Sequence, residues 1–345
     1  MNKPPTIKDI AKQLNVSIST VSRAMRNAPD VNIETRKAVM ALSEQLNYQP
    51  NRLALSLKQK QTHTIGVIVP NLDYVLATMV RGIDEVALEA GYTVMVCQSN
   101  ESFGREIVNT RRLLDSLVDG FIISVSSETK VFDHFKKIQE KQMPIVLFDR
   151  VPADLKAPSV ILDNMDGGYQ ATEHLLEQGY KRIAILAGPK NLGISNSRME
   201  GYLNALKKYK VKPDPHLIIH CDFNQHYAYL ATQELLNMKK RPDAIFTISD
   251  RMAIGAMLAI KEKGLKMPQD IGLVGFNNEP VVNLVTPGIS SVEQPAFELG
   301  KMAAKLFIQT LHNNDDMSEV EEVLKPKLFI RESSQRMLPK NGRLR

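Results

Sequence analysis

Short apolar runs alternate with amphipathic helical stretches through most of this 345-residue chain, from about residue 62 to residue 330. The runs have the length of buried strands, and helix or turn signals follow each one. Strands that alternate with helices form parallel sheets with helices on both faces. The pattern therefore predicts an α/β body with strands at 64–69, 92–98, 120–124, 145–148, 182–186, 217–220, 244–248 and 271–275.

The expected strands fall into two sets that resemble each other. Residues 65–70 (IGVIVP) compare with residues 183–188 (IAILAG), and residues 94–97 (VMVC) compare with residues 218–221 (IIHC). Two similar lobes enclose a cleft at the carboxyl ends of their strands, where open parallel sheets bind ligands. We therefore expect a two-lobed body with a ligand site between the lobes.

Polar side chains follow the expected strands in both lobes. Any one of them could serve only to cap its own loop, but the convergence of so many on one edge favours a polar ligand. The candidates for binding a small effector are Asn71, Asp73, Tyr74, Gln98, Ser124, Ser126, Asp149, Arg150, Asn164, Arg198, Phe223, Asp250 and Asn277.

The excess of positive charge lies at one end of the chain. The sequence has 44 Lys and Arg residues against 38 Asp and Glu residues, a net charge of +6. Residues 1–60 contain 10 of the basic and 4 of the acidic side chains, which is the whole excess. A basic segment on a neutral body indicates that this segment binds a polyanion such as nucleic acid. A solvated basic face is the alternative.

The same N-terminal segment predicts three short helices. Thr6 and Asp9 have the spacing of a capping box before the first helix. Ser17 can cap a second helix that runs to about Met25, and a third helix spans about 32–46. Two short helices joined by a tight turn and braced by a third form a helix-turn-helix unit. A three-helix bundle without a DNA-binding role is the alternative.

Residues 48–61 predict a short hinge. Pro50 disfavours helix before it, Asn51 can cap, and good helix formers follow. So short a helix is marginal alone because nucleation is costly, and we expect it to form against its copy in a dimer and the DNA. The expected organisation is an all-α headpiece over 1–47, a hinge helix and linker over 48–61, a two-lobed effector-binding and dimerisation domain over 62–335, and a tail over 336–345.

Several motifs resemble the LacI/GalR family of bacterial transcription regulators, over nearly the whole chain. They are residues 6–11 (TIKDIA), 16–23 (VSISTVSR), 48–51 (YQPN), 65–70 (IGVIVP) and 329–333 (FIRES). The resemblance implies that Ile18, Ser19 and Arg23 read bases in the major groove. It also implies that Leu57, with Ala54 beside it, wedges into the minor groove and bends the duplex. A buried contact between hinge and body is the alternative role of Leu57.

The expected DNA-binding residues are Thr6, Ser17, Ile18, Ser19, Thr20, Ser22, Arg23, Asn27, Asn32, Tyr48, Asn51, Arg52, Ala54 and Leu57.

The resemblance also implies a periplasmic-binding-protein-like body that binds a sugar. Arg198, within residues 195–202 (SNSRMEGY), matches the arginine that holds the effector in the family, and Asp149, Phe223 and Asp250 match pocket positions. Two positions depart from the family pattern. Residues 73–76 (DYVL) replace the NPFF of many relatives, and Asn277 replaces an aspartate. The identity of the effector is therefore not transferred from any relative.

Other protein classes fit less well. The seven histidines are scattered, without HExxH or GxSxG, and no glycine-rich loop follows the first strand, so we expect no enzyme, no cofactor and no metal site. We expect Cys97 and Cys221 to be free thiols. The apolar runs are too short to cross a bilayer and no export signal is present, which predicts a cytoplasmic protein without a membrane partner. A periplasmic solute-binding protein would fit the body but not the first sixty residues.

The expected function is that of a homodimeric repressor. Two headpieces would occupy the half-sites of a near-palindromic double-stranded operator DNA. A small effector between the lobes would change the angle between them and respace the hinge helices.

Overall fold

The computed structural model describes residues 5–48, 61–312 and 317–336, so the expected hinge residues Asn51, Arg52, Ala54 and Leu57 lie outside the described residues. The chain divides into two compact units, residues 1–62 and residues 63–345. Within the described residues, no helix combines the length and the apolar character needed to cross a membrane.

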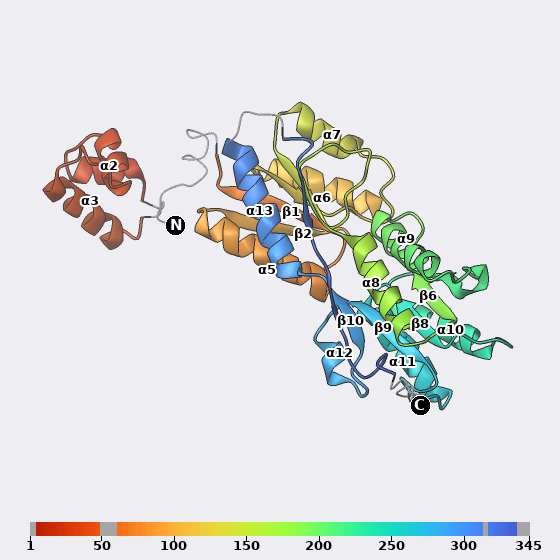
Figure 1. Cartoon of the computed structure of the whole chain (residues 1–345). Helices are drawn as coiled ribbons and strands as arrows, with labels where there is room; N and C mark the ends of the chain where they lie inside the picture. The colour runs from red at the N-terminus through yellow and green to blue at the C-terminus, as the bar shows by residue number, and fades with distance from the viewer. Residues whose placement is uncertain (1–4, 49–60, 313–316, 337–345) are drawn as a thin grey trace. The chain divides into compact units, whose positions relative to one another are not determined.

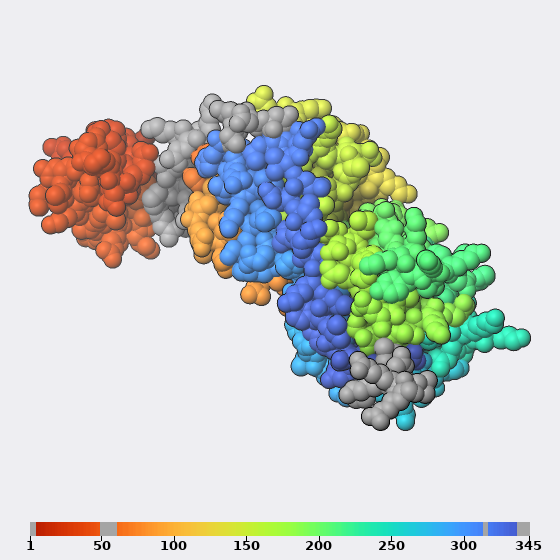
Figure 2. Space-filling model, viewed as in Figure 1, coloured from red at the N-terminus to blue at the C-terminus, as the bar shows by residue number. Residues whose placement is uncertain are grey.

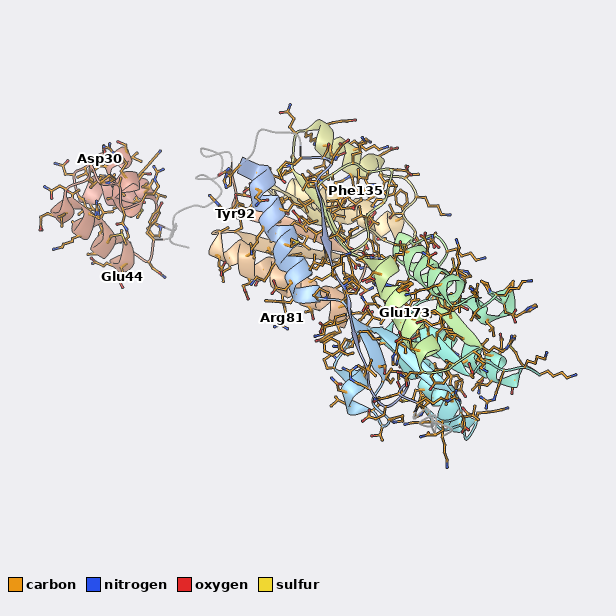
Figure 3. All side chains as sticks on the ribbon, viewed as in Figure 1. Asp30, Glu44, Arg81, Tyr92, Phe135 and Glu173 are labelled. Carbon is orange, nitrogen blue, oxygen red and sulfur yellow. The ribbon has the colours of Figure 1, made fainter. Side chains whose placement is uncertain are left out.

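The first unit contains the three expected helices, α1 (Ile7–Gln13), α2 (Ile18–Met25) and α3 (Ile33–Gln45). The residues that begin them are those the sequence predicts. The backbone N and Oγ1 of Thr6 donate to Asp9 before α1, Ser17 Oγ accepts from the amide of Thr20 in α2, and Asn32 caps α3. A small core of Ile10, Ala11, Val21, Ala24, Val31 and Val39 joins the helices. Charged side chains such as Asp30 and Glu44 lie on the surface of this unit (Figure 3).

The first lobe of the body is a six-stranded parallel sheet covered by helices on both faces (Figure 1). Its strand order is β11-β5-β4-β3-β1-β2. The sheet consists of β1 (Thr64–Val69), β2 (Thr93–Gln98), β3 (Gly120–Ile123), β4 (Ile145–Phe148), β5 (Ser159–Leu162) and β11 (Glu321–Leu324). Helices α5 (Tyr74–Glu89) and α13 (Ala296–His312) share one core with the sheet. Helices α6 (Phe103–Asp115) and α7 (Asp133–Glu140) share the core on its other face.

The second lobe repeats this arrangement. Its strand order is β12-β10-β9-β8-β6-β7, with β12 antiparallel to β10 and the other pairs parallel. The strands are β6 (Ile183–Ala187), β7 (Ile218–His220), β8 (Ala244–Thr247), β9 (Gly272–Asn277), β10 (Ser290–Glu293) and β12 (Lys327–Phe329). The helices are α8 (Asn164–Glu177), α9 (Gly193–Lys208), α10 (Gln225–Asn237), α11 (Asp250–Glu262), the short α12 (Val281–Leu284) and a 3₁₀ turn, η1 (Pro215–Leu217).

The chain passes between the lobes after β5, after β10 and after β11. Figure 2 shows the last of these passages, where the C-terminal segment (dark blue) runs over the surface of the body from the first lobe to the second. The two-lobed α/β body is therefore the predicted one. The eight expected strands are present within one or two residues of their expected bounds, whereas β5, β10, β11 and β12 were not predicted.

Two helices of the second lobe approach each other unusually closely. A Cβ atom on Gly168 of α8 would lie 2.1 Å from the carbonyl oxygen of Arg198, and one on Gly201 of α9 would lie 2.0 Å from that of Met165. Only glycine permits such contact between helix backbones. The glycine pair thus fixes the distance between α8 and α9, and α9 carries Ile194 and Arg198 of the cleft described below.

Candidate functional site

The two lobes face each other across a cleft whose walls come from both. The first lobe contributes the residues after β1, the start of α5 and the residues after β4. The second lobe contributes the residue Phe223 after β7, α9, the start of α11 and the residues at the ends of β9 and β10. The lining residues are Asn71, Asp73, Val75, Leu76, Asp149, Arg150, Ile194, Arg198, Phe223, Ser249, Arg251, Asn277, Glu279 and Gln294.

Arg198 is the central cation of the cleft. It is 2% exposed, and its guanidinium lies 3.7 Å from the centroid of the Phe276 ring. Nε donates to Asn164 Oδ1 at 2.8 Å and Nη1 to the carbonyl oxygen of Ile248 at 2.7 Å. Burial lowers the pKa of Arg198 to about 10, which still leaves it charged at neutral pH. Its hydrogen-bond partners in the described ranges are neutral, and Asp149 and Asp250 balance its positive charge at longer range.

A hydrogen-bond chain through Gln294 links the lobes. Arg198 Nη2 donates to Gln294 Oε1 at 3.5 Å, and Gln294 Nε2 donates to Asp149 Oδ1 of the first lobe at 2.8 Å. Asp149 is buried and has a φ of 59°, in the left-handed region where residues other than glycine are uncommon. The surrounding structure therefore holds the backbone of Asp149 in an uncommon left-handed conformation at the cleft wall.

Arg150 follows Asp149 and forms an ion pair with Glu101 of the first lobe. Arg150 Nη1 lies 2.7 Å from Glu101 Oε2, which also accepts from the backbone amide of Ser127. Burial alone would raise the pKa of Glu101, but the hydrogen bond and charge of Arg150, together with the hydrogen bonds from Ser127, outweigh it and hold the pKa below its ordinary value. Arg150 Nε is buried and has no hydrogen-bond partner among the described residues, and its guanidinium lies 6.0 Å from the ring of Phe223 in the second lobe.

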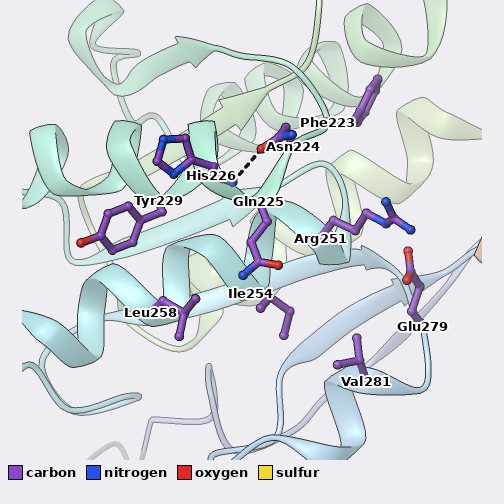
Figure 4. A pocket seen from close by; sticks show the side chains of 10 residues that line it. All are labelled: Phe223, Asn224, Gln225, His226, Tyr229, Arg251, Ile254, Leu258, Glu279 and Val281. Carbon is purple, nitrogen blue, oxygen red and sulfur yellow. Dashed lines mark hydrogen bonds between the residues drawn. The ribbon is translucent and has the colours of Figure 1, made fainter. Parts of the chain in front are cut away.

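An ion pair between the lobes lies farther out in the cleft. Arg251 Nη1 of α11 is 2.9 Å from Asp73 Oδ2 at the start of α5, and both side chains are about half exposed. Glu279 faces Arg251 in Figure 4, and burial raises the pKa of Glu279 above its ordinary value. The cleft therefore offers charged forks, carboxylates and an aromatic face, which suits a ligand with several hydroxyl groups.

The expected effector residues divide into two groups. Seven line the cleft: Asn71, Asp73, Asp149, Arg150, Arg198, Phe223 and Asn277. Six do not line it: Tyr74, Gln98, Ser124, Ser126, Asn164 and Asp250.

The residues of the second group have other surroundings. Asn164 orients Arg198, and Ser126 donates from its amide and its hydroxyl to the buried Glu106 of α6. Gln98 bonds to Asn100, and Tyr74 is 44% exposed at the start of α5. Ser124 is buried, and within the part of the chain that the structure describes its hydroxyl has no hydrogen-bond partner.

Asp250 lies behind the cleft wall, with both oxygens occupied. Oδ1 accepts from Ser291 Oγ and Oδ2 from the amide of Glu279, each at 2.7 Å. Its neighbour Ser249 lines the cleft instead. An N-capping serine and the aspartate after it point in different directions, so a sequence match to the pair does not decide which one faces a ligand.

Sequence reasoning missed several residues of the cleft. The set of expected effector residues lacks Val75, Leu76, Ile194, Ser249, Arg251, Glu279 and Gln294. Gln294 directly follows β10, a strand that was not predicted, so nothing marked it as the end of a strand. Among the described residues, no group of three or more His, Cys, Asp and Glu side chains could hold a metal ion.

The second candidate site is the exposed face of α2 in the headpiece. Ile18 is 45% exposed, Ser19 is also exposed, and Thr20 and Ser22 are partly exposed. Arg23 Nη1 is 2.7 Å from Asp30 Oδ2, and both side chains are about half exposed. The side chains assigned to base reading therefore share one accessible helix.

The other headpiece candidates shape the backbone around α2. Thr6, Ser17 and Asn32 form the caps described above. Asn27 has a φ of 53° where the chain turns after α2, and Tyr48 packs against the small core.

Comparison with known proteins identifies both units. Residues 6–51 match the family of bacterial regulatory proteins named after LacI, and residues 62–332 match the family of periplasmic binding proteins and the sugar-binding domain of LacI-type regulators. A ribose operon repressor of Halalkalibacterium halodurans is 33% identical over 330 residues, which are 95% of this chain and 97% of the relative. The repressor CytR of Escherichia coli is 31% identical over 335 residues, 97% of each chain.

Solved structures agree with these matches. A lac repressor dimer bound to operator and an anti-inducer superimposes with a TM-score of 0.86 at 27% identity, over 96% of this chain and 99% of that one. A LacI-family regulator from Enterococcus faecium with bound ribose superimposes with a TM-score of 0.69 at 28% identity, over 80% of this chain and 100% of that one. The motifs, the fold and the relatives agree over nearly the full length, and the chain belongs to the LacI family of bacterial regulatory proteins.

Proposed function

We propose that this protein is a homodimeric transcription repressor that binds operator DNA and whose operator affinity is controlled by a sugar or sugar derivative bound between the two lobes. The observation that carries the proposal is the hydrogen-bond chain from Arg198 through Gln294 to Asp149, because it joins the two lobes inside the cleft. A ligand that replaces those bonds with its own would favour one arrangement of the lobes over another. An effector acts only through such a difference in affinity.

The chemistry of the cleft supports a polyhydroxylated effector. Arg150 and Arg198 present forks of donors, Asp149 is a buried acceptor, and Phe223 is a face on which a sugar ring can stack. The relatives named above include a ribose operon repressor and a ribose-bound regulator. Aliphatic Val75 and Leu76 in the first-lobe wall set this cleft apart from the aromatic pattern of the family.

Entry of the effector would require the lobes to part. The cleft has a volume of about 80 Å³, whereas sites for small ligands have roughly 300–1,000 Å³. Parting the lobes breaks the bond between Gln294 and Asp149 and the ion pair between Asp73 and Arg251. Such a movement would change the spacing of the two hinges, which we place at residues 48–61 of each subunit.

An exposed apolar surface on the second lobe supports dimerisation. Leu284 of α12 is 82% exposed, and Leu258 of α11 and Val281 of α12 are also exposed. Leu258 and Val281 line a groove of about 660 Å³ shown in Figure 4. A second copy of the chain would cover this surface, as the relative bound to operator is a dimer. The two headpieces, residues 1–47, would then read the two half-sites of a palindrome in the bacterial cytoplasm.

Selection of DNA from a random pool by the full chain tests the DNA-binding half of the proposal. We expect enrichment of a near-palindrome whose binding weakens steeply with salt, by about 0.9 log unit per log unit of salt for each phosphate neutralised. Arg23→Ala should relax the preference at one position of each half-site by roughly 1–3 kcal/mol. Residues 62–345 alone should not bind, and binding by that fragment would refute the headpiece assignment.

A thermal-shift screen of pentoses, hexoses and nucleosides tests the effector half of the proposal. A sugar that raises the melting temperature of the wild type but not of Asp149→Ala, and that also changes operator affinity, is the expected result. A screen in which the stabilising compounds act equally on both proteins would place the ligand outside the cleft.

A further inference from the structure

The loop that joins β9 to α12 forms part of the cleft wall in an unusual backbone shape. Asn277 has a φ of 108° and Asn278 a φ of 53°, so two successive residues other than glycine adopt positive φ. Asn277 and Glu279 face the cleft. Residues in such conformations persist only where their surroundings hold them, and they gather at functional sites. Contacts with neighbouring elements must therefore hold the loop of residues 277–279 in this conformation.

The hydrogen bonds that hold this loop meet at the carboxyl group of Asp250. Oδ2 accepts from the backbone amide of Glu279, and Oδ1 accepts from Ser291 Oγ, each at 2.7 Å. Ser291 Oγ in turn accepts from the amide of Asn278 at 3.0 Å. One buried carboxyl thus holds two consecutive amides of the loop, one directly and one through a serine.

The site is built to hold a carboxyl group in little space. Asp250 has no exposed surface, and a Cβ atom on Gly275 of β9 would lie 2.2 Å from its Oδ1. A second anchor comes from the C-terminal segment, where Arg331 Nη2 donates to Asn278 Oδ1 at 2.6 Å. The loop is therefore held from α11, from β10 and from the end of the chain.

Three charged groups face Asp250 from the elements around it. They are Glu279 on the loop, Arg331 on the C-terminal segment and Arg198 on α9. Burial, which favours the neutral acid, raises the pKa of Asp250 to about 7. The hydrogen bonds from Ser291 and from the Glu279 amide and the charge of Arg331 oppose the rise, whereas the charge of Glu279 adds to it. The carboxyl group therefore changes charge within the range of pH in which a bacterial cell operates.

We propose that Asp250 is the positioning residue of the effector cleft, and that its protonation loosens the loop of residues 277–279 and so changes the cleft wall. The ionised carboxylate accepts the Glu279 amide in a charge-assisted bond, which is about twice as strong as a neutral one. Proton uptake turns that bond into a neutral one. Asn277 and Glu279 then hold their positions in the cleft less firmly, and so does α12, which follows directly.

Hydrogen exchange of the Glu279 amide in the full-length protein tests this role. We expect its protection factor, relative to the intrinsic exchange rate at each pH, to fall roughly fivefold between pH 8 and pH 6 in the wild type. In Asp250→Asn, the protection should lie near the lower value and be independent of pH. The isosteric amide can still accept from the backbone but cannot take up a proton.

Asp243→Asn is the matched control. Asp243 also accepts backbone amides in the second lobe, those of Lys181 and Arg182, but it lies at the other end of β8. That variant should keep the pH dependence of Glu279 protection. Protection that is the same at pH 6 and pH 8 in the wild type would overturn the proposal even if Asp250→Asn failed to fold. A pH dependence that survives in a folded Asp250→Asn would overturn it as well.

The functional meaning of this loop rests on the proposed effector cleft, whereas the exchange measurement needs no effector. Loss of the pH effect with intact sugar binding would refute only the role of Asp250. An intact pH effect on the Glu279 amide without sugar binding in the cleft would refute only the proposed cleft function.

Discussion

Arg198 both faces the ligand cleft and stabilises the wall of the cleft. Its guanidinium faces the cleft, yet two of its donors are committed to the Ile248 carbonyl and to Asn164. Such a residue holds the wall of the site as well as presenting charge to a ligand. The bonds also fix the guanidinium in advance, so a ligand does not have to order it.

Arg198→Ala should therefore destabilise the protein without any ligand present. The Ile248 carbonyl oxygen and Asn164 Oδ1 would lose their donors inside the lobe, and unsatisfied buried groups cost about 1–3 kcal/mol each. Urea unfolding should show a fall of at least that size in the free energy of unfolding. Arg251→Ala is the control, because its half-exposed ion pair with Asp73 is worth about 0–1 kcal/mol. If the two variants unfolded at the same urea concentration, Arg198 would have no structural role.

At the scale of single residues, sequence reasoning found the residues that the family motifs mark. Arg198, Asp149 and Phe223 were expected from the family motifs, and they line the cleft. Gln294 was not expected, because a lone glutamine after an unrecognised strand has no signature. Asp250 was expected in the cleft but lies behind it, since a side chain's direction at a helix N-terminus depends on tertiary packing rather than on the residue type.

At the scale of elements, the periodic pattern predicted the edge strands β2 and β7 and, inside the two sheets, β1, β3, β4, β6, β8 and β9. The inner strands of this set are buried, and buried strands are the ones that a run of apolar residues reveals. The missed strands are short or polar. β11 (Glu321–Leu324) begins with two glutamates at a sheet edge, and β10 (Ser290–Glu293) buries serines. β11 pairs with β5 and β12 pairs with β10, both far away in sequence, so local pattern could not identify these two strands.

The close contact of α8 and α9 gives a prediction about glycine. Gly201→Ala should force the helices apart and move Arg198 away from Asn164, because its Cβ would meet the Met165 carbonyl at 2.0 Å. Overpacking of this kind costs about 1–3 kcal/mol. Gly193→Ala at the start of the same helix is the control, since no atom of the described residues lies within 4 Å of its Cβ position. Chemical denaturation of both variants checks the prediction, and a Gly201 variant as stable as the Gly193 variant would contradict it.

The C-terminal segment gives a prediction about pH. His174 of α8 is buried, and its Nε2 is 2.7 Å from Ser334 Oγ of that segment. Burial lowers the pKa of His174 below its ordinary value of 6.5. The unfolded chain therefore binds a proton that the folded protein resists, so this contribution to stability is complete above pH 6.5 and is lost as the pH falls below it.

Urea unfolding at pH 7.5 and pH 5.5 measures this effect. The free energy of unfolding should fall between the two values, and it should fall less in His174→Gln. The exposed His226→Gln is a suitable control, because His226 forms no ion pair with a described residue, and it should behave as the wild type does. A His174 variant with the full acid sensitivity of the wild type would assign that sensitivity to other groups.

At the scale of the whole molecule, the effector cleft and the proposed dimer surface share one stretch of chain. Asn277 and Glu279 line the cleft, and Val281 and Leu284 follow within a few residues on the exposed apolar surface. Arg251 and Glu279 line both the cleft and the groove of Figure 4. A change in the cleft wall therefore reaches the proposed partner contact without passing through the core of the lobe.

The dimer surface itself is tested by Leu284→Asp. If a second copy covers Leu284, burial of that side chain contributes roughly 1.5–3 kcal/mol, so its loss at both symmetric positions should raise the dimer dissociation constant at least tenfold. Val131→Asp is the matched control. Val131 is also exposed, at 51%, but it precedes α7 in the first lobe and is not part of the proposed surface on the second lobe. Sedimentation equilibrium measures both constants, and melting curves establish that each variant is folded. A single subunit reaches only one half-site, so Leu284→Asp should also bind a palindromic operator with the affinity of an isolated half-site, whereas Val131→Asp should bind as the wild type does. An unchanged dimer in Leu284→Asp, or equal dissociation of both variants, would mean that the subunits meet through another surface.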